Sequence, residues 1–110
     1  MTQLLKTSKD QMKVWRHHLH QHPETEFSVF DTAALVVQKL TEFGLIVHEG
    51  IGKIGIVGQL TKGTSDQAIG LRADMDALAI QEQNEFPHKS INDGCMHACG
   101  HDGHTSMLLG

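Results

Sequence analysis

The sequence predicts an α/β fold, of which it contains a partial α/β/α sandwich. Before Gly44 the apolar residues recur with a period of about 3.6, and after Gly44 the period falls to 2. Residues 81–100 show no period, and a helical pattern resumes near Gly103. Helices on either side of strands are typical of α/β layers, so we expect the order helix, helix, strands, loop, helix.

Two helices are expected before Gly44. The apolar residues of the first, over residues 8–21, recur at helical spacing; they are Met12, Trp15 and Leu19. Pro23 ends this helix, because the residue before a proline is pushed out of helical geometry. Ser28 is the expected N-cap of the second helix, and Gly44 is its expected C-terminal stop.

Strands are expected over residues 45–48, 54–60 and 67–74, with a turn at residues 61–66. The long loop over residues 81–100 contains several glycine, proline and asparagine residues. Loops of that length in compact domains tend to be functional. We therefore expect the candidate functional residues to lie between the last strand and the last helix.

Composition excludes several classes of protein. The net charge of −4 and the pI near 6.1 argue against a nucleic-acid-binding protein. No stretch approaches the roughly 20 apolar residues of a membrane span, and the first residues lack the apolar core of a signal peptide. We therefore expect a cytoplasmic protein with no membrane and no nucleic-acid partner.

Residues 96–104, Met-His-Ala-Cys-Gly-His-Asp-Gly-His, combine side chains that bind transition metals. Cys99 and His101 are two apart, so in an extended segment both point to the same side. They could share one ion or each serve one ion of a pair. Thiolate favours Zn²⁺, and nearby carboxylates would admit Mn²⁺ or Co²⁺. The cluster predicts a metal site with Cys99 and His101 as ligands, supported by Asp102 and His104.

Three alternatives use neighbouring residues. Cys95, His97, Cys99 and His101 could close one structural zinc site in a protein without enzymatic activity. His101 and His104 could both be ligands, because they are three apart at a helix start. A separate site could use His18 and His22, which have i, i+4 spacing, although such histidines are more often polar helix positions.

Asp74 and Asp76 directly follow the third expected strand. Carboxylates at the carboxyl end of a strand lie where open α/β sheets place their ligands. They could orient a ligand histidine or tune a metal-bound water. The alternative is a strand-end cap or an ion pair with Arg72.

Three segments together resemble the amidohydrolases related to hippurate hydrolase, N-acyl-amino-acid amidohydrolase and the plant indole-acetyl-amino-acid hydrolases. The segments are Arg16–Glu24, Leu71–Leu78 and Met96–His104. The resemblance covers nearly the whole chain, and its last segment is highly specific. The chain departs from the family at His17, where a second Arg is usual, and at Ala79, where a Pro is usual.

The resemblance implies that residues 1–110 are the N-terminal part of a two-metal, aminopeptidase-like catalytic domain. It implies that Cys99 and His101 bind metal, and that Asp74 is a supporting position. The two divalent ions would be Mn²⁺ or Zn²⁺, with Co²⁺ or Ni²⁺ as further candidates. The implied reaction is hydrolysis of the amide bond of N-acyl amino acids, by an enzyme that could form a homo-oligomer. A related dipeptidase or deacylase is an alternative, although its usual His-x-Asp strand end is replaced here by Arg72-Ala73-Asp74.

The resemblance also implies that the general-base Glu, the remaining ligands and the lid domain of the family are absent from this chain. We therefore expect the 110-residue chain to be inactive alone and to bind metal weakly.

Overall fold

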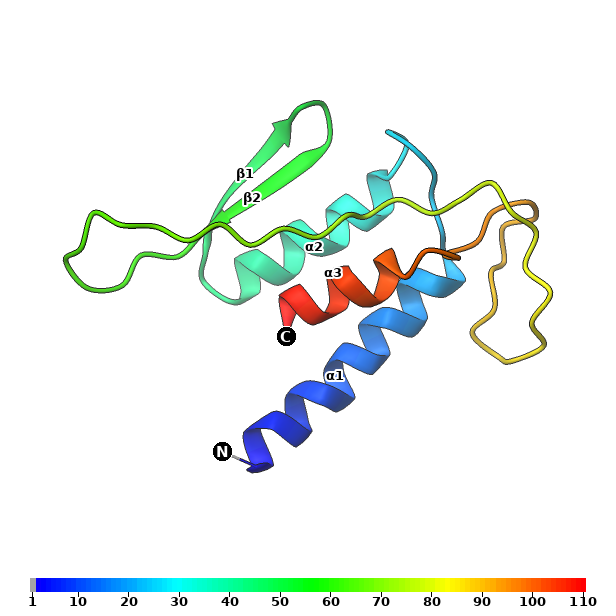
Figure 1. The fold of residues 1–110 in the computed structure, drawn as a ribbon, viewed down its shortest axis with the longest axis horizontal. Coiled ribbons are helices and arrows are strands. Elements are labelled where there is room, and N and C mark those ends of the chain that lie inside the picture. Colours follow the sequence, from blue (N-terminus) through cyan, green and yellow to red (C-terminus); the bar gives the residue numbers. More distant parts are fainter. Residues whose placement is uncertain (1) are drawn as a thin grey trace.

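The computed structural model describes residues 2–110 as three helices and one two-stranded sheet (Figure 1). The elements in chain order are α1 (Thr2–Gln21), α2 (Phe30–Glu42), β1 (Ile46–Ile51), β2 (Gly55–Gln59) and α3 (His101–Leu109). The predicted α/β class and element order are confirmed, but helices lie close to helices over much of the molecule because the sheet is small. Within residues 2–110 no helix is both long and apolar enough to cross a bilayer.

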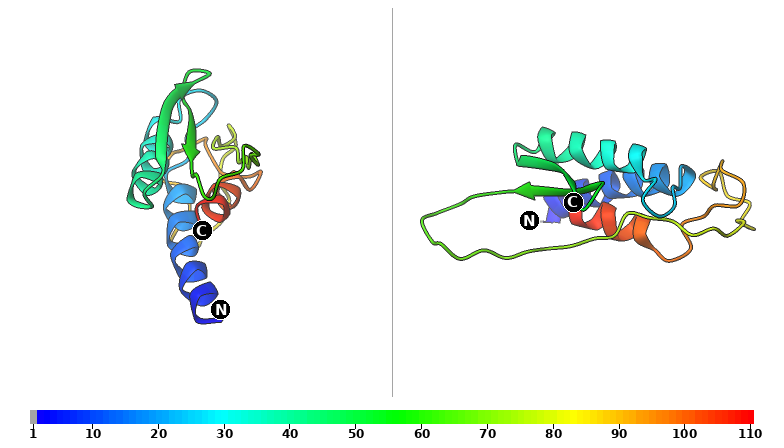
Figure 2. Two further views of the ribbon diagram at one scale, coloured as in Figure 1. Left: turned by 90° about the vertical axis from the view of Figure 1, so that its left-hand side faces the viewer. Right: turned by 90° about the horizontal axis from the view of Figure 1, so that it is seen from above.

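Helix α1 begins six residues earlier than its apolar pattern predicts. Only its second half is anchored: Trp15 and Leu19 are buried, whereas Leu4 and Leu5 are exposed. The Trp15 ring lies 6.0 Å from that of Phe43, centroid to centroid, just after α2. Helix α3 packs along the same half of α1 (Figure 2). The predicted apolar face therefore forms the small core between the three helices.

The N-terminus of α2 is capped from a distance. The predicted cap, Ser28, is wrong: the N-cap position is Val29, which has no capping side chain. The Glu24 carboxylate instead accepts hydrogen bonds from the backbone N–H groups of Asp31 and Thr32 and from the Thr32 hydroxyl, at 3.0, 2.7 and 2.7 Å. A carboxylate suits this place because the first N–H groups of a helix have no partner within it.

Strands β1 and β2 form an antiparallel pair, with Val47 opposite Gly58 and an irregularity between His48 and Ile51. The predicted third strand, residues 67–74, is wrong for this structure. That segment is extended but unpaired, and Ile69 is 90% exposed (Figure 1). A strand needs a partner for its backbone groups, and residues 2–110 offer this segment no paired strand.

The long loop after Leu78 is irregular, as predicted, and several backbone hydrogen bonds fix its course. Leu78 and Met96 form an antiparallel bridge with bonds of 2.9 and 3.0 Å. The Ile91 N–H donates to the Gln21 carbonyl oxygen at the end of α1, 3.0 Å away. The two ends of the loop are therefore held side by side next to α1.

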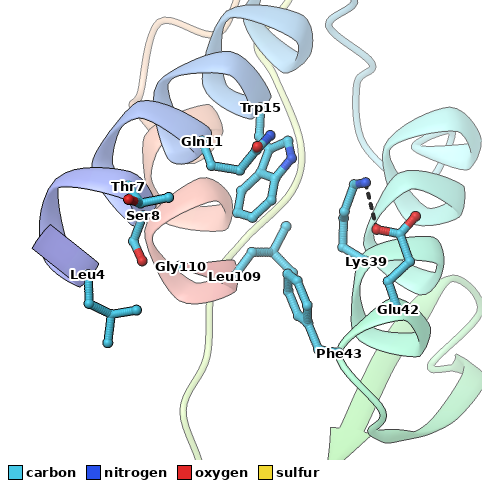
Figure 3. A pocket seen from close by; sticks show the side chains of 10 residues that line it. All are labelled: Leu4, Thr7, Ser8, Gln11, Trp15, Lys39, Glu42, Phe43, Leu109 and Gly110. Carbon is cyan, nitrogen blue, oxygen red and sulfur yellow. Dashed lines mark hydrogen bonds and ion pairs between the residues drawn. The ribbon is translucent and has the colours of Figure 1, made fainter.

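A shallow hollow lies between the start of α1, the end of α2 and the end of α3 (Figure 3). Its apolar lining comes from Leu4, Trp15, Phe43 and Leu109, and Lys39 and Glu42, which form an ion pair of 2.8 Å, also line it. None of residues 96–104 lines it. The metal-binding candidates are therefore in another part of the molecule.

Candidate metal centre

His101 is the first residue of α3 and lies on its side facing the segment 74–76. Gly100 before it has φ +92°, a left-handed conformation that favours glycine and allows the chain to turn into the helix. His101 Nδ1 lies 2.9 Å from the backbone carbonyl oxygen of Asp76 and 3.1 Å from its carboxylate Oδ1. Because a carbonyl oxygen only accepts, Nδ1 carries a proton, and in the neutral ring Nε2 then keeps its lone pair. That is the arrangement of a metal-binding histidine with its second nitrogen anchored.

Asp74 lies on the other side of the same ring. Its Oδ2 is 3.8 Å from His101 Nε2, while its Oδ1 pairs with Arg72 Nη2 at 2.7 Å. The Asp74 backbone carbonyl accepts a hydrogen bond of 2.9 Å from the Thr105 hydroxyl on α3. The predicted supporting residue is therefore next to the candidate ligand, but Asp76 is the residue that orients His101.

Cys99 is an exposed free thiol two residues before His101, whereas Cys95 is turned away. The Cys95 thiol donates a weak bond to the Pro23 carbonyl oxygen at 3.5 Å. Burial, together with the nearby charge of Glu24, raises the pKa of Cys95, which disfavours the thiolate that binds metal. Of the two cysteines, only Cys99 is freely accessible.

The closed zinc site of Cys95, His97, Cys99 and His101 is not formed. Over residues 2–110, no three His, Cys, Asp or Glu side chains are arranged to hold a metal ion. The physical reason is the burial of His97, which is 4% exposed and lies in the interior beside α1, while Cys99 faces solvent. Burial lowers the pKa of His97, although the charge of Asp102 acts in the opposite sense.

The alternative site of His18 and His22, at the end of α1, gains no third ligand among residues 2–110 either. The rings of His18 and His22 are 4.5 Å apart, centroid to centroid. His22 Nδ1 donates to the His18 carbonyl oxygen at 2.8 Å, which uses one nitrogen to satisfy the helix end. On α3, His104 is exposed, with its ring 5.7 Å from that of His101.

Asp102 is almost completely buried and connects α3 to α1. Its Oδ2 lies 2.9 Å from His20 Nδ1 and 3.5 Å from Arg16 Nε. Burial alone would raise the pKa of Asp102, but hydrogen bonds from His20 and from the Gly103 N–H, together with nearby positive charge, hold it below its ordinary value. In the structure Asp102 therefore anchors the first turn of α3, and its support of a metal site stays a prediction.

Glu82 is a member of this cluster that the sequence did not indicate. Its Oε2 lies 3.0 Å from His20 Nε2 and accepts from Asn84 at 2.9 Å, and its Oε1 accepts from the Ser90 N–H at 2.7 Å. Although burial acts to raise it, these hydrogen bonds hold the pKa of Glu82 below its ordinary value. No sequence signal marks Glu82, because it lies in a loop without periodicity.

Cys99 and His101 fit a transition metal in donor type. A thiolate and an imidazole are common zinc ligands, and the hydrogen bonds from His101 to Asp76 leave Nε2 available. Two donors fill only half of a tetrahedral zinc sphere. The described residues therefore fit part of a metal centre.

The chain is similar in sequence to known proteins. A model of peptidase family M20/M25/M40 matches residues 70–110, which include Asp74, Asp76, Cys99 and His101. The chain is 60% identical to "Hippurate hydrolase" of Campylobacter jejuni over 94 residues, covering 86% of this chain and 24% of the relative. It is 46% identical to "N-acyl-L-amino acid amidohydrolase" of Geobacillus stearothermophilus, over 93% of this chain and 28% of the relative.

Solved structures show the same fold. A Bacillus subtilis protein, described as a dinuclear metal binding peptidase from the M20 family, matches with a TM-score of 0.89 and 35% identity. That match covers 94% of this chain and 30% of the other. A structure from methicillin resistant Staphylococcus aureus also has a TM-score of 0.89, with 37% identity over 98% of this chain and 30% of the other. The chain thus spans about a quarter of the length of the curated relatives it matches, and its residues 70–110 are similar to peptidase family M20/M25/M40.

Proposed function

We propose that this chain contributes Cys99 and His101 to a two-metal centre that hydrolyses the amide bond of N-acyl amino acids. The observation that carries the proposal is the anchoring of His101 Nδ1 by Asp76, which presents Nε2 as a lone-pair donor. It lies inside the segment that the family model matches. The names of the curated relatives support the substrate class, and the description of the Bacillus subtilis structure supports two metals.

The metal ions would supply Lewis-acid activation of water and of the scissile carbonyl. The residues of this chain hold and orient: Cys99 and His101 donate to metal, and Asp76 fixes the ring of His101. Asp74, 3.8 Å from His101 Nε2, adds negative charge beside the ligand and is proposed as a supporting residue. The general-base Glu is not assigned to any residue here.

The metal ions are proposed to be Mn²⁺ or Zn²⁺, with Co²⁺ and Ni²⁺ as further candidates, since thiolate favours Zn²⁺, imidazole also suits Ni²⁺, and nearby carboxylates would admit Mn²⁺ or Co²⁺. A cytoplasmic location and a homo-oligomeric state stay predictions. So does the expectation that the 110-residue chain alone is inactive, because Cys99 and His101 supply only a minority of the ligands of a two-metal centre.

Zinc titration of the 110-residue chain, followed by calorimetry, tests the ligands. We expect weak binding that is lost in Cys99→Ser and in His101→Ala. His48→Ala is the matched histidine control, because His48 lies on β1, away from residues 74–101. Equal zinc binding by wild type, Cys99→Ser and His101→Ala would contradict the ligand assignment.

The activity is tested by replacing the matching segment of the Campylobacter jejuni hippurate hydrolase with this chain. We expect the hybrid to release glycine from hippurate, and the same hybrid with Cys99→Ser to lose that activity. A hybrid that folds and binds metal but leaves N-acyl amino acids intact would refute the proposed substrate class. Hippurate turnover by the 110-residue chain alone would refute its predicted inactivity.

A further inference from the structure

A buried histidine outside the metal-binding segment connects three parts of the fold. His20, near the end of α1, is 8% exposed and lies between two carboxylates. Its Nδ1 is 2.9 Å from Asp102 Oδ2 on α3, and its Nε2 is 3.0 Å from Glu82 Oε2 in the long loop. Both carboxylate side chains are at most 2% exposed. Neither water nor a mobile side chain therefore replaces these contacts easily.

The geometry sets the hydrogen-bond roles. A hydrogen bond to an ionised carboxylate oxygen requires a donor, so the bridge is complete when both ring nitrogens of His20 donate, one to Asp102 and one to Glu82. Glu82, at the loop end of the bridge, is itself held in place, because it also accepts hydrogen bonds from the Asn84 side chain and from the Ser90 N–H. The bridge thus extends from the loop, through α1, to the first turn of α3.

The first turn of α3 is held on two sides. Asp102 is bonded to His20 on the α1 side, while the neighbouring His101 is bonded to Asp76 and Thr105 is bonded to the Asp74 carbonyl. Successive residues on a helix point about 100° apart, so fixing Asp102 fixes the rotation of α3 and with it the direction of the His101 ring. Loss of the His20 contact would leave Asp102 only the longer contact with Arg16 Nε, 3.5 Å, on the α1 side, so α3 would be held less firmly in rotation.

We propose that His20 is a positioning residue, which holds the His101 ring in its metal-binding orientation through its bond to Asp102. This inference rests on the proposed function, because it assumes that His101 is a ligand. In this proposal the hydrogen bond between His20 and Asp102 sets the orientation of the His101 ring, and the packing of the buried His20 ring does not. The contact to Glu82 anchors the bridge without itself setting the direction of His101.

Two substitutions separate the two contacts. In Asn the side-chain nitrogen is two bonds beyond Cβ, as Nδ1 is in histidine, so His20→Asn keeps a donor toward Asp102. In Gln the nitrogen is three bonds beyond Cβ, as Nε2 is, so His20→Gln keeps a donor toward Glu82. His22→Gln is the matched control, because His22 directly follows α1 and its ring hydrogen-bonds only to the His18 carbonyl oxygen at the end of that helix.

The experiment measures the fraction of His101 in the Nδ1–H tautomer by ¹⁵N imidazole NMR of the metal-free 110-residue chain. Zn²⁺ affinity of the same samples is measured by calorimetry. We expect His20→Gln to lose the single tautomer of His101 and to bind zinc roughly tenfold more weakly, the usual lower bound for lost support of a ligand. His20→Asn and His22→Gln should keep both properties. Equal effects of His20→Asn and His20→Gln, or an unchanged His101 in His20→Gln, would overturn the proposal.

The fluorescence of Trp15 shows whether each variant folds. If the variants do not fold, ¹⁵N imidazole NMR of His20 in the unmodified chain still tests the proposal. Both ring nitrogens of His20 should carry a proton and show hydrogen-bonded proton resonances; one bare nitrogen would refute the bridge. The proposed function fails separately, through absence of zinc binding by wild type. The tautomer of His101 is read without metal, so the two failures are distinguishable.

Discussion

Removal of the Glu24 carboxylate should destabilise the fold by releasing the N-terminus of α2. Glu24 is seven and eight residues before the two N–H groups that it caps, and it also accepts from the Thr32 hydroxyl. Thr32 is 3% exposed, so in Glu24→Ala its hydroxyl and N–H would have no ready access to water. The substitution therefore removes a cap and leaves buried donors unpaired.

The magnitude follows from these contacts. Loss of a side-chain cap costs about 1 kcal/mol, and a buried donor left unpaired costs about 1–3 kcal/mol. We expect Glu24→Ala to lower the free energy of unfolding by about 2–4 kcal/mol, a large share of the 5–15 kcal/mol typical of a domain. Glu24→Gln keeps one acceptor oxygen but presents an amide NH₂ to the N-terminus of the helix. Its stability should therefore fall between wild type and Glu24→Ala.

Urea unfolding followed by the fluorescence of Trp15, the only tryptophan, measures this difference. With a slope of about 2 kcal/mol per molar urea, the middle of the usual range, the midpoint of Glu24→Ala should fall by roughly 1–2 M. Glu85→Ala is the control, because Glu85 is exposed and its ion pair with Lys89 is long, at 3.9 Å. If Glu24→Ala unfolds at the same urea concentration as Glu85→Ala, the assigned cap is wrong.

Three further outcomes are expected. Ser28→Ala should change the free energy of unfolding by less than about 0.5 kcal/mol in the same urea assay, because Ser28 caps no helix. Glu82→Gln should flatten the acid side of the profile of stability against pH, measured by urea unfolding at each pH. The pKa of Glu82 is lower in the folded state than in the unfolded state, so its ionised carboxylate stabilises the fold fully above the unfolded-state pKa of about 4.3. That stabilisation is lost as the pH falls below this value. A wild-type profile as flat as that of Glu82→Gln would contradict this. Cys95→Ser should leave zinc affinity unchanged in calorimetry, whereas a closed Cys/His site would lose it.

The candidate ligands were predictable because their chemistry is local. Cys99 and His101 are two residues apart in a segment dense in metal-binding side chains, and no long-range contact is needed to notice them. The helices were predictable for a similar reason, since an apolar face repeats within a few turns. The start of α1 was missed because the apolar residues of its first turns, Leu4 and Leu5, are exposed and belong to no buried face. The sequence therefore has no apolar pattern there that would predict a helix.

Contacts between distant residues were not predictable. The cap of α2 comes from Glu24 instead of Ser28, because a carboxylate can reach back from a turn. The segment 67–74 has the pattern of a strand, yet pairing depends on a partner that residues 2–110 do not provide. Sequence patterns report what a segment favours, whereas pairing depends on its neighbours in space.

The sequence by itself determined the α/β class, and it supplied the prediction that a thiol and an imidazole, Cys99 and His101, bind metal. Only the tertiary structure decided which carboxylate serves which histidine. Asp76 orients His101, and Glu82 and Asp102 hold His20, across separations of 25, 62 and 82 residues. The physical reason is that donor type is a property of each side chain, whereas orientation and burial arise only when the chain brings distant segments together.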